Sequence, residues 1–159
     1  MKRLLIVAAL TFGILCTAAS AGARPVAWSG TTGTPGGMEI SGIPLQSVML
    51  DVAAGKVRIQ NLQMVMTCTD TQDGLVSPVA FFTGASPRAT MRSNRYTIEY
   101  TADAGGRNGQ VRVTGQLRSN GRGTARVTMT ATSTDSSTGA TIENCTGAVG
   151  FQVRRGPAS

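Results

Sequence analysis

Apolar and polar residues alternate in short runs along the chain, and the clearest pair of runs predicts a β-hairpin. Residues 111–117 (VRVTGQL) and 124–132 (TARVTMTAT) each place small or apolar side chains at every second position. An Asn-Gly pair at 120–121 lies between them and suits a tight turn with positive φ. Such runs are typical of antiparallel strands with one buried and one solvated face. We expect Arg112, Arg126 and the threonines on the solvated face.

Six further segments have the composition of strands bounded by turn residues. They cover residues 26–32, 47–52, 56–69, 78–83, 95–100 and 145–153. Within 56–69 the apolar parity shifts after Ile59, which predicts either a β-bulge near Gln60 and Asn61 or two strands joined by a kink. About seven to nine short strands, without a helical apolar stripe, predict an all-β fold: an antiparallel β-sandwich or a flattened β-barrel.

The N-terminal residues follow a different pattern, that of a secretory signal peptide. Lys2 and Arg3 precede an apolar run at 4–15, and small residues surround Ala21 and Ala23. The run is shorter than the roughly twenty apolar residues that span a membrane. We therefore expect no transmembrane segment, cleavage near Ala21 or Ala23, and secretion to the periplasm, the cell envelope or the medium.

Cleavage would divide the chain into a signal peptide, 1–23, and a single β domain, 24–159, whose end (154–159) we expect to be a short disordered tail. Cys16 lies upstream of both cleavage sites and follows the bulky Leu15, so we predict no lipoprotein. Loss of the two basic residues of the leader leaves thirteen basic residues against eight acidic ones. The predominance of arginine over lysine, with abundant Ala, Gly and Thr, favours a bacterial origin.

Two cysteines, Cys68 and Cys145, remain after cleavage, and both fall on the apolar parity of their strands. Neither belongs to a C-x-x-C motif and the chain has no histidine, so a redox or nucleophilic thiol is the less favoured alternative. In an oxidising compartment we expect a structural disulfide that ties the last strand to the middle of the domain.

Four segments of the predicted domain form a recognisable order. Residues 28–30 (WSG) begin it, 55–68 (GKVRIQNLQMVMTC) lead into a strand that ends at a cysteine, 113–130 form a hairpin, and 145–154 (CTGAVGFQVR) close it. This order resembles an uncharacterised group of small secreted bacterial β-proteins. The resemblance implies a β-sandwich-like fold with one internal disulfide. It implies no activity and no catalytic residue.

The absence of histidine excludes Ser-His-Asp and Cys-His catalysis and histidine-ligated zinc. The Gly-rich segments 33–37 and 104–110 lack the features of a phosphate-binding loop, and 70–74 lacks the full spacing of a calcium loop and is expected to be a turn. We expect no cofactor, no metal and no enzymatic activity. A carboxylate-dependent hydrolase remains an alternative. The scattered carboxylates include Asp51, Asp70, Asp73, Glu99, Asp103, Asp135 and Glu143.

Arginines provide the strongest functional signal. Arg112, Arg118, Arg122 and Arg126 lie on or beside the predicted hairpin and would form one anion-binding face. We expect its partner to be an anionic cell-envelope or extracellular polymer, or another protein; a merely solvated charged face is the alternative. Specific nucleic-acid binding is not expected, because few aromatic residues are available to stack on bases. A second candidate is a secreted inhibitor or interaction protein that presents segment 84–95 as an exposed loop.

Overall fold

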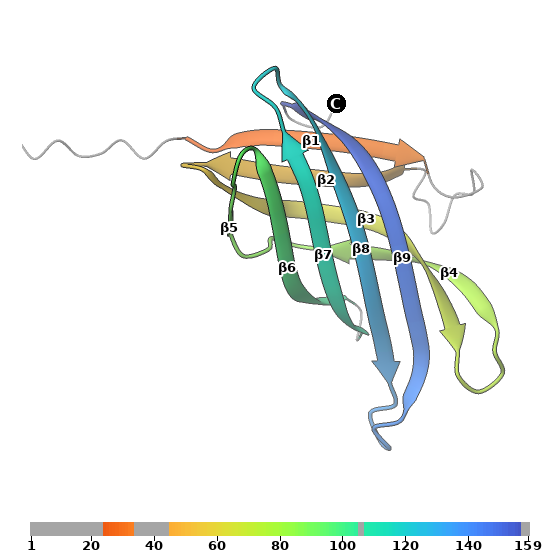
Figure 1. Ribbon diagram of the computed structural model, residues 1–159. Coiled ribbons are helices and arrows are strands. Elements are labelled where there is room, and N and C mark those ends of the chain that lie inside the picture. Colours follow the sequence, from red (N-terminus) through yellow and green to blue (C-terminus); the bar gives the residue numbers. More distant parts are fainter. Residues whose placement is uncertain (1–23, 34–44, 105–106, 157–159) are drawn as a thin grey trace, which may run out of the picture.

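The computed structural model describes residues 24–33, 45–104 and 107–156, and the regular structure there is entirely β-strand (Figure 1). The predicted signal peptide with its cleavage sites lies outside these residues, as do 34–37 of the first Gly-rich segment and 157–159 of the predicted tail. The strands are β1 (Val26–Gly33), β2 (Leu45–Ala53), β3 (Lys56–Asp70), β4 (Val76–Thr83), β5 (Ala89–Thr90), β6 (Arg95–Ala104), β7 (Arg107–Leu117), β8 (Arg122–Thr134) and β9 (Thr141–Arg155). Within the described ranges no helix is long and apolar enough to cross a membrane.

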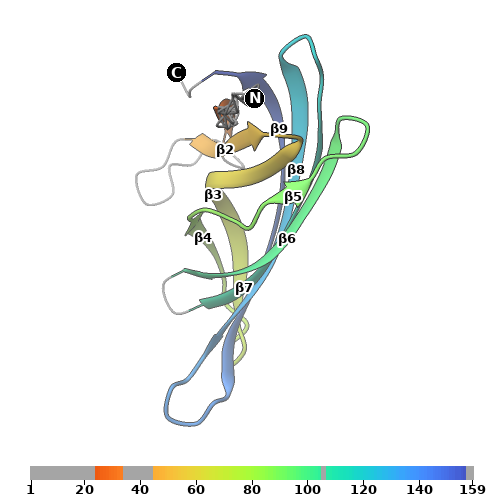
Figure 2. The same cartoon turned by 90° about the vertical axis from the view of Figure 1, so that its left-hand side faces the viewer.

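All paired strands are antiparallel and belong to one sheet, ordered β4-β3-β2-β1-β9-β8-β7-β6, with β5 paired to β3. The sheet folds over into two layers whose strands cross, with β1–β4 behind and β6–β9 in front (Figure 1). From the side the two layers lie face to face (Figure 2). Strand β9 joins them, because it pairs with β8 in front and with both β1 and β3 behind. The predicted antiparallel, sandwich-like β fold is confirmed.

Each of the eight predicted strands is present and is somewhat longer than its alternating run. Side chains predicted to face inward are buried between the layers, among them Val113, Val127 and Phe151. Burial of an aliphatic or aromatic side chain of this size contributes roughly 1.5–3 kcal/mol to the free energy of unfolding. Because the alternation is regular, every second residue of β6–β9 lies on the outer face of the front layer.

A β-bulge interrupts β3 at Gln60. Consecutive residues of β2 pair with Asn61 and Ile59, so Gln60 is the extra residue. The predicted bulge is confirmed, and the alternative of two strands joined by a kink is wrong because β3 continues unbroken. The extra residue allows Ile59 and Leu62 to face the core together although they differ in parity, and both are fully buried.

The β7–β8 hairpin brings two of the predicted arginines together. Its four-residue turn spans 118–121 and includes the expected Asn-Gly pair, of which only Gly121 has a positive φ, 78°. The Arg118 N–H donates to the Arg122 carbonyl at 2.9 Å, and the Gly121 N–H donates to the Arg118 carbonyl at 3.1 Å. This is a type I turn followed by a left-handed glycine, not a two-residue type I′ turn. Arg118 and Arg122 consequently stand opposite each other at the end of the hairpin.

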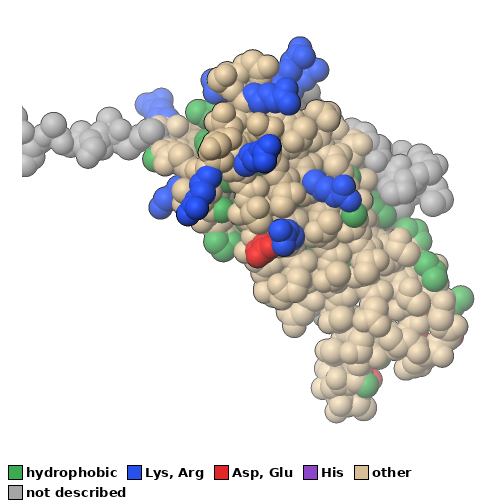
Figure 3. Space-filling model, viewed as in Figure 1, with side chains coloured by type: hydrophobic (Ala, Val, Ile, Leu, Met, Phe, Trp, Pro, Cys, Tyr) green, Lys and Arg blue, Asp and Glu red, His purple; other side chains and the backbone are tan. Residues whose placement is uncertain are grey.

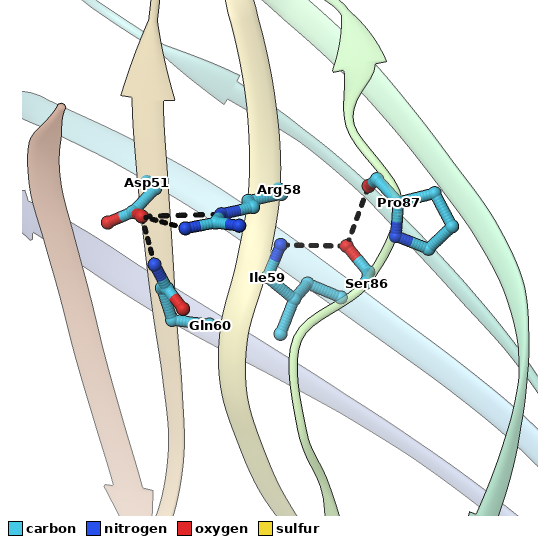
Figure 4. Close-up of polar contacts among 6 residues, drawn as sticks. All are labelled: Asp51, Arg58, Ile59, Gln60, Ser86 and Pro87. Carbon is cyan, nitrogen blue, oxygen red and sulfur yellow. Dashed lines mark hydrogen bonds and ion pairs between the residues drawn. The ribbon is translucent and has the colours of Figure 1, made fainter.

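The segment 84–95, predicted as an exposed loop, is held against the back layer. Ser86 is buried, and its backbone N–H donates to the Ile59 carbonyl at 3.0 Å. Its hydroxyl accepts a hydrogen bond from the Ile59 N–H at 2.9 Å and donates to the Pro87 carbonyl at 2.9 Å (Figure 4). The short strand β5, which the sequence did not indicate, pairs with β3. Nine of the twelve residues of 84–95 are exposed, as predicted, but Ser86 and β5 fasten the segment to β3.

The predicted disulfide joins Cys68 of β3 to Cys145 of β9, which are directly paired residues. Both are buried, and 77 positions separate them in the chain. The alternative of a free redox or nucleophilic thiol is thereby wrong for these two sulfurs. The Glu143 carboxylate lies close to them, but bonded sulfurs are not thiolate ligands for a metal, and Arg107 pairs with this carboxylate at 2.7 Å.

Strand β9 extends further than its alternation indicated. Arg154 and Arg155, which we expected in the tail, belong to the sheet, and the Gly156 N–H donates to the Ala27 carbonyl at 3.0 Å. The Arg155 guanidinium lies 5.5 Å from the centre of the Trp28 ring. A cation–π contact of this kind contributes about 0.5–1 kcal/mol at an exposed site. The start of the domain is thus fastened to its last described strand.

Candidate anion-binding face

The solvent-facing residues of β6–β9 are mainly arginine, threonine, glutamine and asparagine, and the charged ones are unevenly distributed. Figure 3 shows this face: basic side chains gather over its upper part, towards the β7–β8 turn, whereas the lower part is mostly uncharged. The four predicted residues Arg112, Arg118, Arg122 and Arg126 are all exposed, and all lie on this face. The sheet has therefore placed them together as the parity predicted.

Three arginines form a cationic row at the turn end of the face: Arg118, Arg122 and Arg154. Arg122 and Arg154 are directly paired residues of β8 and β9, and Arg118 stands across the turn from Arg122. In the part of the chain that the structure describes, no carboxylate forms an ion pair with any of the three. Like charges directly opposite each other destabilise an antiparallel pair, by a few tenths to about 1 kcal/mol. The cationic row concentrates positive potential at a cost to stability.

The other two predicted residues differ in their surroundings. Arg126 lies opposite Gly150 on β9, and a Cβ at that glycine would meet no atom within 4 Å, so open space adjoins this arginine. Arg112 pairs with Glu99, with 2.8 Å between Nη1 and Oε1, and both side chains are 61 % exposed. An exposed pair contributes only about 0.2–1 kcal/mol, yet it offsets the charge of Arg112. Arg126 thus adds an exposed positive charge further along β8, whereas Arg112 is largely compensated.

Three arginines outside this group contact partners within the domain. Arg58 pairs with Asp51 at 3.1 Å and Arg107 with Glu143 at 2.7 Å, and in both pairs the side chains are mostly buried. Arg155 lies over Trp28. The cationic row shares its solvent exposure and its lack of an ion pair among the described residues with Arg88, Arg92 and Arg95. It differs from them in lying at the turn end of β7–β9 on the outer face.

A hollow of about 240 Å³ opens beside the cationic row. It is lined by Arg118 and Arg122 together with Gln116, Thr124 and Gln152. The last three are neighbours across β7, β8 and β9 in the strand register. Guanidinium, amide and hydroxyl groups converge there, which suits an anionic group flanked by hydrogen-bonding groups.

Six of the seven carboxylates considered for catalysis, all except Asp103, form ion pairs or accept hydrogen bonds in turns. Asp51 is buried, and its Oδ2 accepts hydrogen bonds from Arg58 Nη2 at 3.1 Å and from Gln60 Nε2 (Figure 4). The bulge at Gln60 directs that amide to the carboxylate. Of the hollows described on the outer face, one contains a single carboxylate, that of Glu99, and the others contain none.

The aspartates of two turns accept backbone hydrogen bonds. Asp70 Oδ1 accepts from the Gln72 N–H at 2.7 Å, and the prediction of a turn at 70–74 is confirmed. Asp135 Oδ1 accepts from the Ser137 hydroxyl at 2.5 Å and from its N–H at 2.7 Å. These bonds, the side-chain one first, lower the pKa of Asp135 below its usual range. The turn aspartates therefore act as caps within their own loops.

Sequence reasoning missed two residues of this face. Arg154 was assigned to the tail, although it shares the outward parity of Gln152 and could have been found by extending the alternation of β9. Gly150 was recognised as a strand residue, but its position opposite Arg126 depends on the register between β8 and β9, which alternation does not determine.

No protein-family model, no curated protein and no solved structure matches this chain. The resemblance to small secreted bacterial β-proteins therefore stays a prediction. The function has to be argued from the chemistry of the face itself.

Proposed function

We propose that this protein is a secreted, non-enzymatic β-domain that binds an acidic polymer of the cell envelope or the extracellular space through the outer face of β6–β9. The observation that carries the proposal is the cationic row, whose three arginines stand side by side without a carboxylate partner among the described residues. An acidic ligand would supply the missing counter-charges.

Guanidinium groups suit this task because their planar donors match carboxylate and phosphate oxygens two at a time. An anion between Arg122 and Arg154 would also relieve the repulsion between these paired residues. After loss of the leader, the excess of thirteen basic over eight acidic residues adds a longer-range attraction that salt screens.

Secretion and the lack of catalysis are parts of the proposal with separate support. A buried disulfide between Cys68 and Cys145 favours an oxidising compartment, as does the leader-like pattern of 1–23. The chain has no histidine, and the carboxylates described above are occupied by arginines or by turn amides. An inhibitory loop at 84–95 has no comparable observation in its favour, because Ser86 and β5 bind that segment to β3.

Retention on immobilised polyanions tests the proposal. The full chain, expressed with its own N-terminal segment, is passed over polygalacturonate and over inorganic polyphosphate at increasing salt. We expect retention at low salt, and an affinity that is lower by at least about tenfold for Arg122→Thr/Arg154→Thr, since each charged hydrogen bond is worth about 1.5 kcal/mol or more.

A matched control removes the same charge elsewhere. Lys56→Thr/Arg88→Thr alters two exposed residues at the start of β3 and before β5, away from the face. It should elute close to the wild-type protein. Failure of the wild-type protein to bind either polymer at low salt, or equal loss in the two double variants, would refute the proposal.

A further inference from the structure

The hollow beside the cationic row continues into a trough along β8 and β9. A second hollow, of about 570 Å³, shares Thr124 and Gln152 with the first and contains Arg126 and Gly150. A third, of about 670 Å³, shares Ala148 with the second. From Arg122 to Thr130 this trough runs roughly 27 Å at the rise of a β-strand. The three open hollows adjoin one another at these shared residues, and together we name them the β8–β9 trough.

Small residues of β9 form the floor of the trough. Ala148 and Gly150 occupy consecutive outward positions, opposite Thr128 and Arg126 of β8. A Cβ at Gly150 would meet no atom within 4 Å, and this glycine does not have a positive φ. Neither packing nor backbone conformation requires glycine here, so its effect on the structure is the open space beside Arg126.

The chemistry of the trough changes along its length. Arginines line the end at the turn, whereas hydroxyl and amide groups line the other end. Gln110, Thr130, Thr146 and Thr67 are neighbours in register across β7, β8, β9 and β3, and all are exposed. The one arginine at that end is Arg112, which pairs with Glu99.

We infer that the β8–β9 trough binds a linear acidic polysaccharide built from uronic acids, with its carboxylates on the arginines and its ring hydroxyls on the threonine and glutamine side chains. The inference rests on the proposed function and names its ligand class. A sugar chain carries hydroxyl groups along its whole length, so it matches both ends of the trough. A polyuronate and a polyphosphate both carry a charge at every unit, but each uronate unit adds ring hydroxyl groups, which polyphosphate lacks. Polyphosphate therefore matches only the arginine end, and a nucleic acid, with fewer hydroxyl groups for each charge, matches the hydroxyl-lined end less well.

The lack of exposed aromatic rings in the trough also distinguishes a polysaccharide from a nucleic acid as its ligand. Phe151 is the aromatic residue on the lining of the described hollows of the trough, and at 2 % exposure it offers no ring face to a base. Stacking, on which single-stranded nucleic-acid binding depends, is therefore not available there.

Titration of the full chain with three soluble probes tests the inference: a galacturonate hexamer, a neutral glucose hexamer, and inorganic polyphosphate of six units. We expect the uronate to bind most tightly. Gly150→Val fills the trough and should lower its affinity about tenfold, whereas Gly84→Val should leave it unchanged. Gly84 is a matched control because a Cβ there also meets nothing within 4 Å, and it lies outside the trough.

A second variant does not depend on filling space. Thr130→Val/Thr146→Val removes two hydroxyls with little change of shape and should lower uronate affinity a few-fold while leaving polyphosphate affinity unchanged. Polyphosphate binding at least as tight as uronate, with both trough variants like wild type, would overturn the trough assignment but leave the proposed function standing. Absence of binding to either anionic probe would refute both.

Discussion

Tyr96 and Gly115 show how single residues shape the layer that carries the arginines. They are directly paired on β6 and β7, and Tyr96 is buried with its hydroxyl donating to the Thr124 carbonyl at 3.3 Å. Burial raises the pKa of this phenol, so it stays protonated as a donor. A Cβ at position 115 would collide with the Tyr96 hydroxyl and the Thr124 carbonyl. The Thr124 carbonyl and the Tyr96 phenol, and not an unusual φ, require glycine here.

Substitution of Gly115 should therefore destabilise the folded protein. We expect Gly115→Ala to lower the free energy of unfolding by about 1–3 kcal/mol, the usual effect of overpacking. Gly150→Ala, in the same layer but facing open space, should leave it unchanged or raise it by up to about 1 kcal/mol. Urea denaturation of both variants measures the difference, and equal destabilisation would contradict this explanation.

Among the elements, β3 and β9 depend on each other through a short contact. Thr67–Asp70 pairs with Glu143–Thr146, and the disulfide lies within these four residue pairs. Cys68→Ala/Cys145→Ala should lower the free energy of unfolding by about 2–5 kcal/mol, because the unfolded chain regains the freedom of a long loop.

Hydrogen exchange should show which part of the double cysteine variant opens first. In the variant, the amides of 67–70 and 143–146 should lose protection before those of the β7–β8 hairpin, whose pairing runs along both strands. An unchanged denaturation midpoint after reduction of the wild-type protein would show that the bond adds no stability to this fold.

Local alternation predicted the strands because burial of one face is a property of each strand alone. The bulge was predictable for the same reason, since the parity change after Ile59 is visible in the sequence. β5 was not, because it has two residues and no pattern. Nor was the burial of Ser86, whose hydroxyl meets the Ile59 amide across 27 positions of chain.

At the scale of the whole molecule, the candidate site divides in the same way. Arg118, Arg122 and Arg126 come from strands joined by one tight hairpin, so their common face follows from local parity. Arg154 and Gly150 join them only through the register of β9, and β9 also pairs with β1 and β3 of the other layer. Such long-range pairings leave no trace in alternation, which is why the trough could not be predicted.

The cationic row links function to stability, because paired arginines that await an anion should weaken the free protein. We expect Arg122→Thr, at low salt and without ligand, to be more stable than the wild-type protein by a few tenths to about 1 kcal/mol. With saturating polygalacturonate the wild-type protein should become the more stable of the two. It binds the polymer more tightly than Arg122→Thr does, and tighter binding to the folded state adds more stability.

Urea denaturation of the wild-type protein and Arg122→Thr, each with and without polygalacturonate, is the most direct test of this account. The predicted result is a variant that is more stable alone and less stabilised by the polymer. A variant that is less stable alone, and that gains as much stability from the polymer as the wild-type protein does, would contradict it.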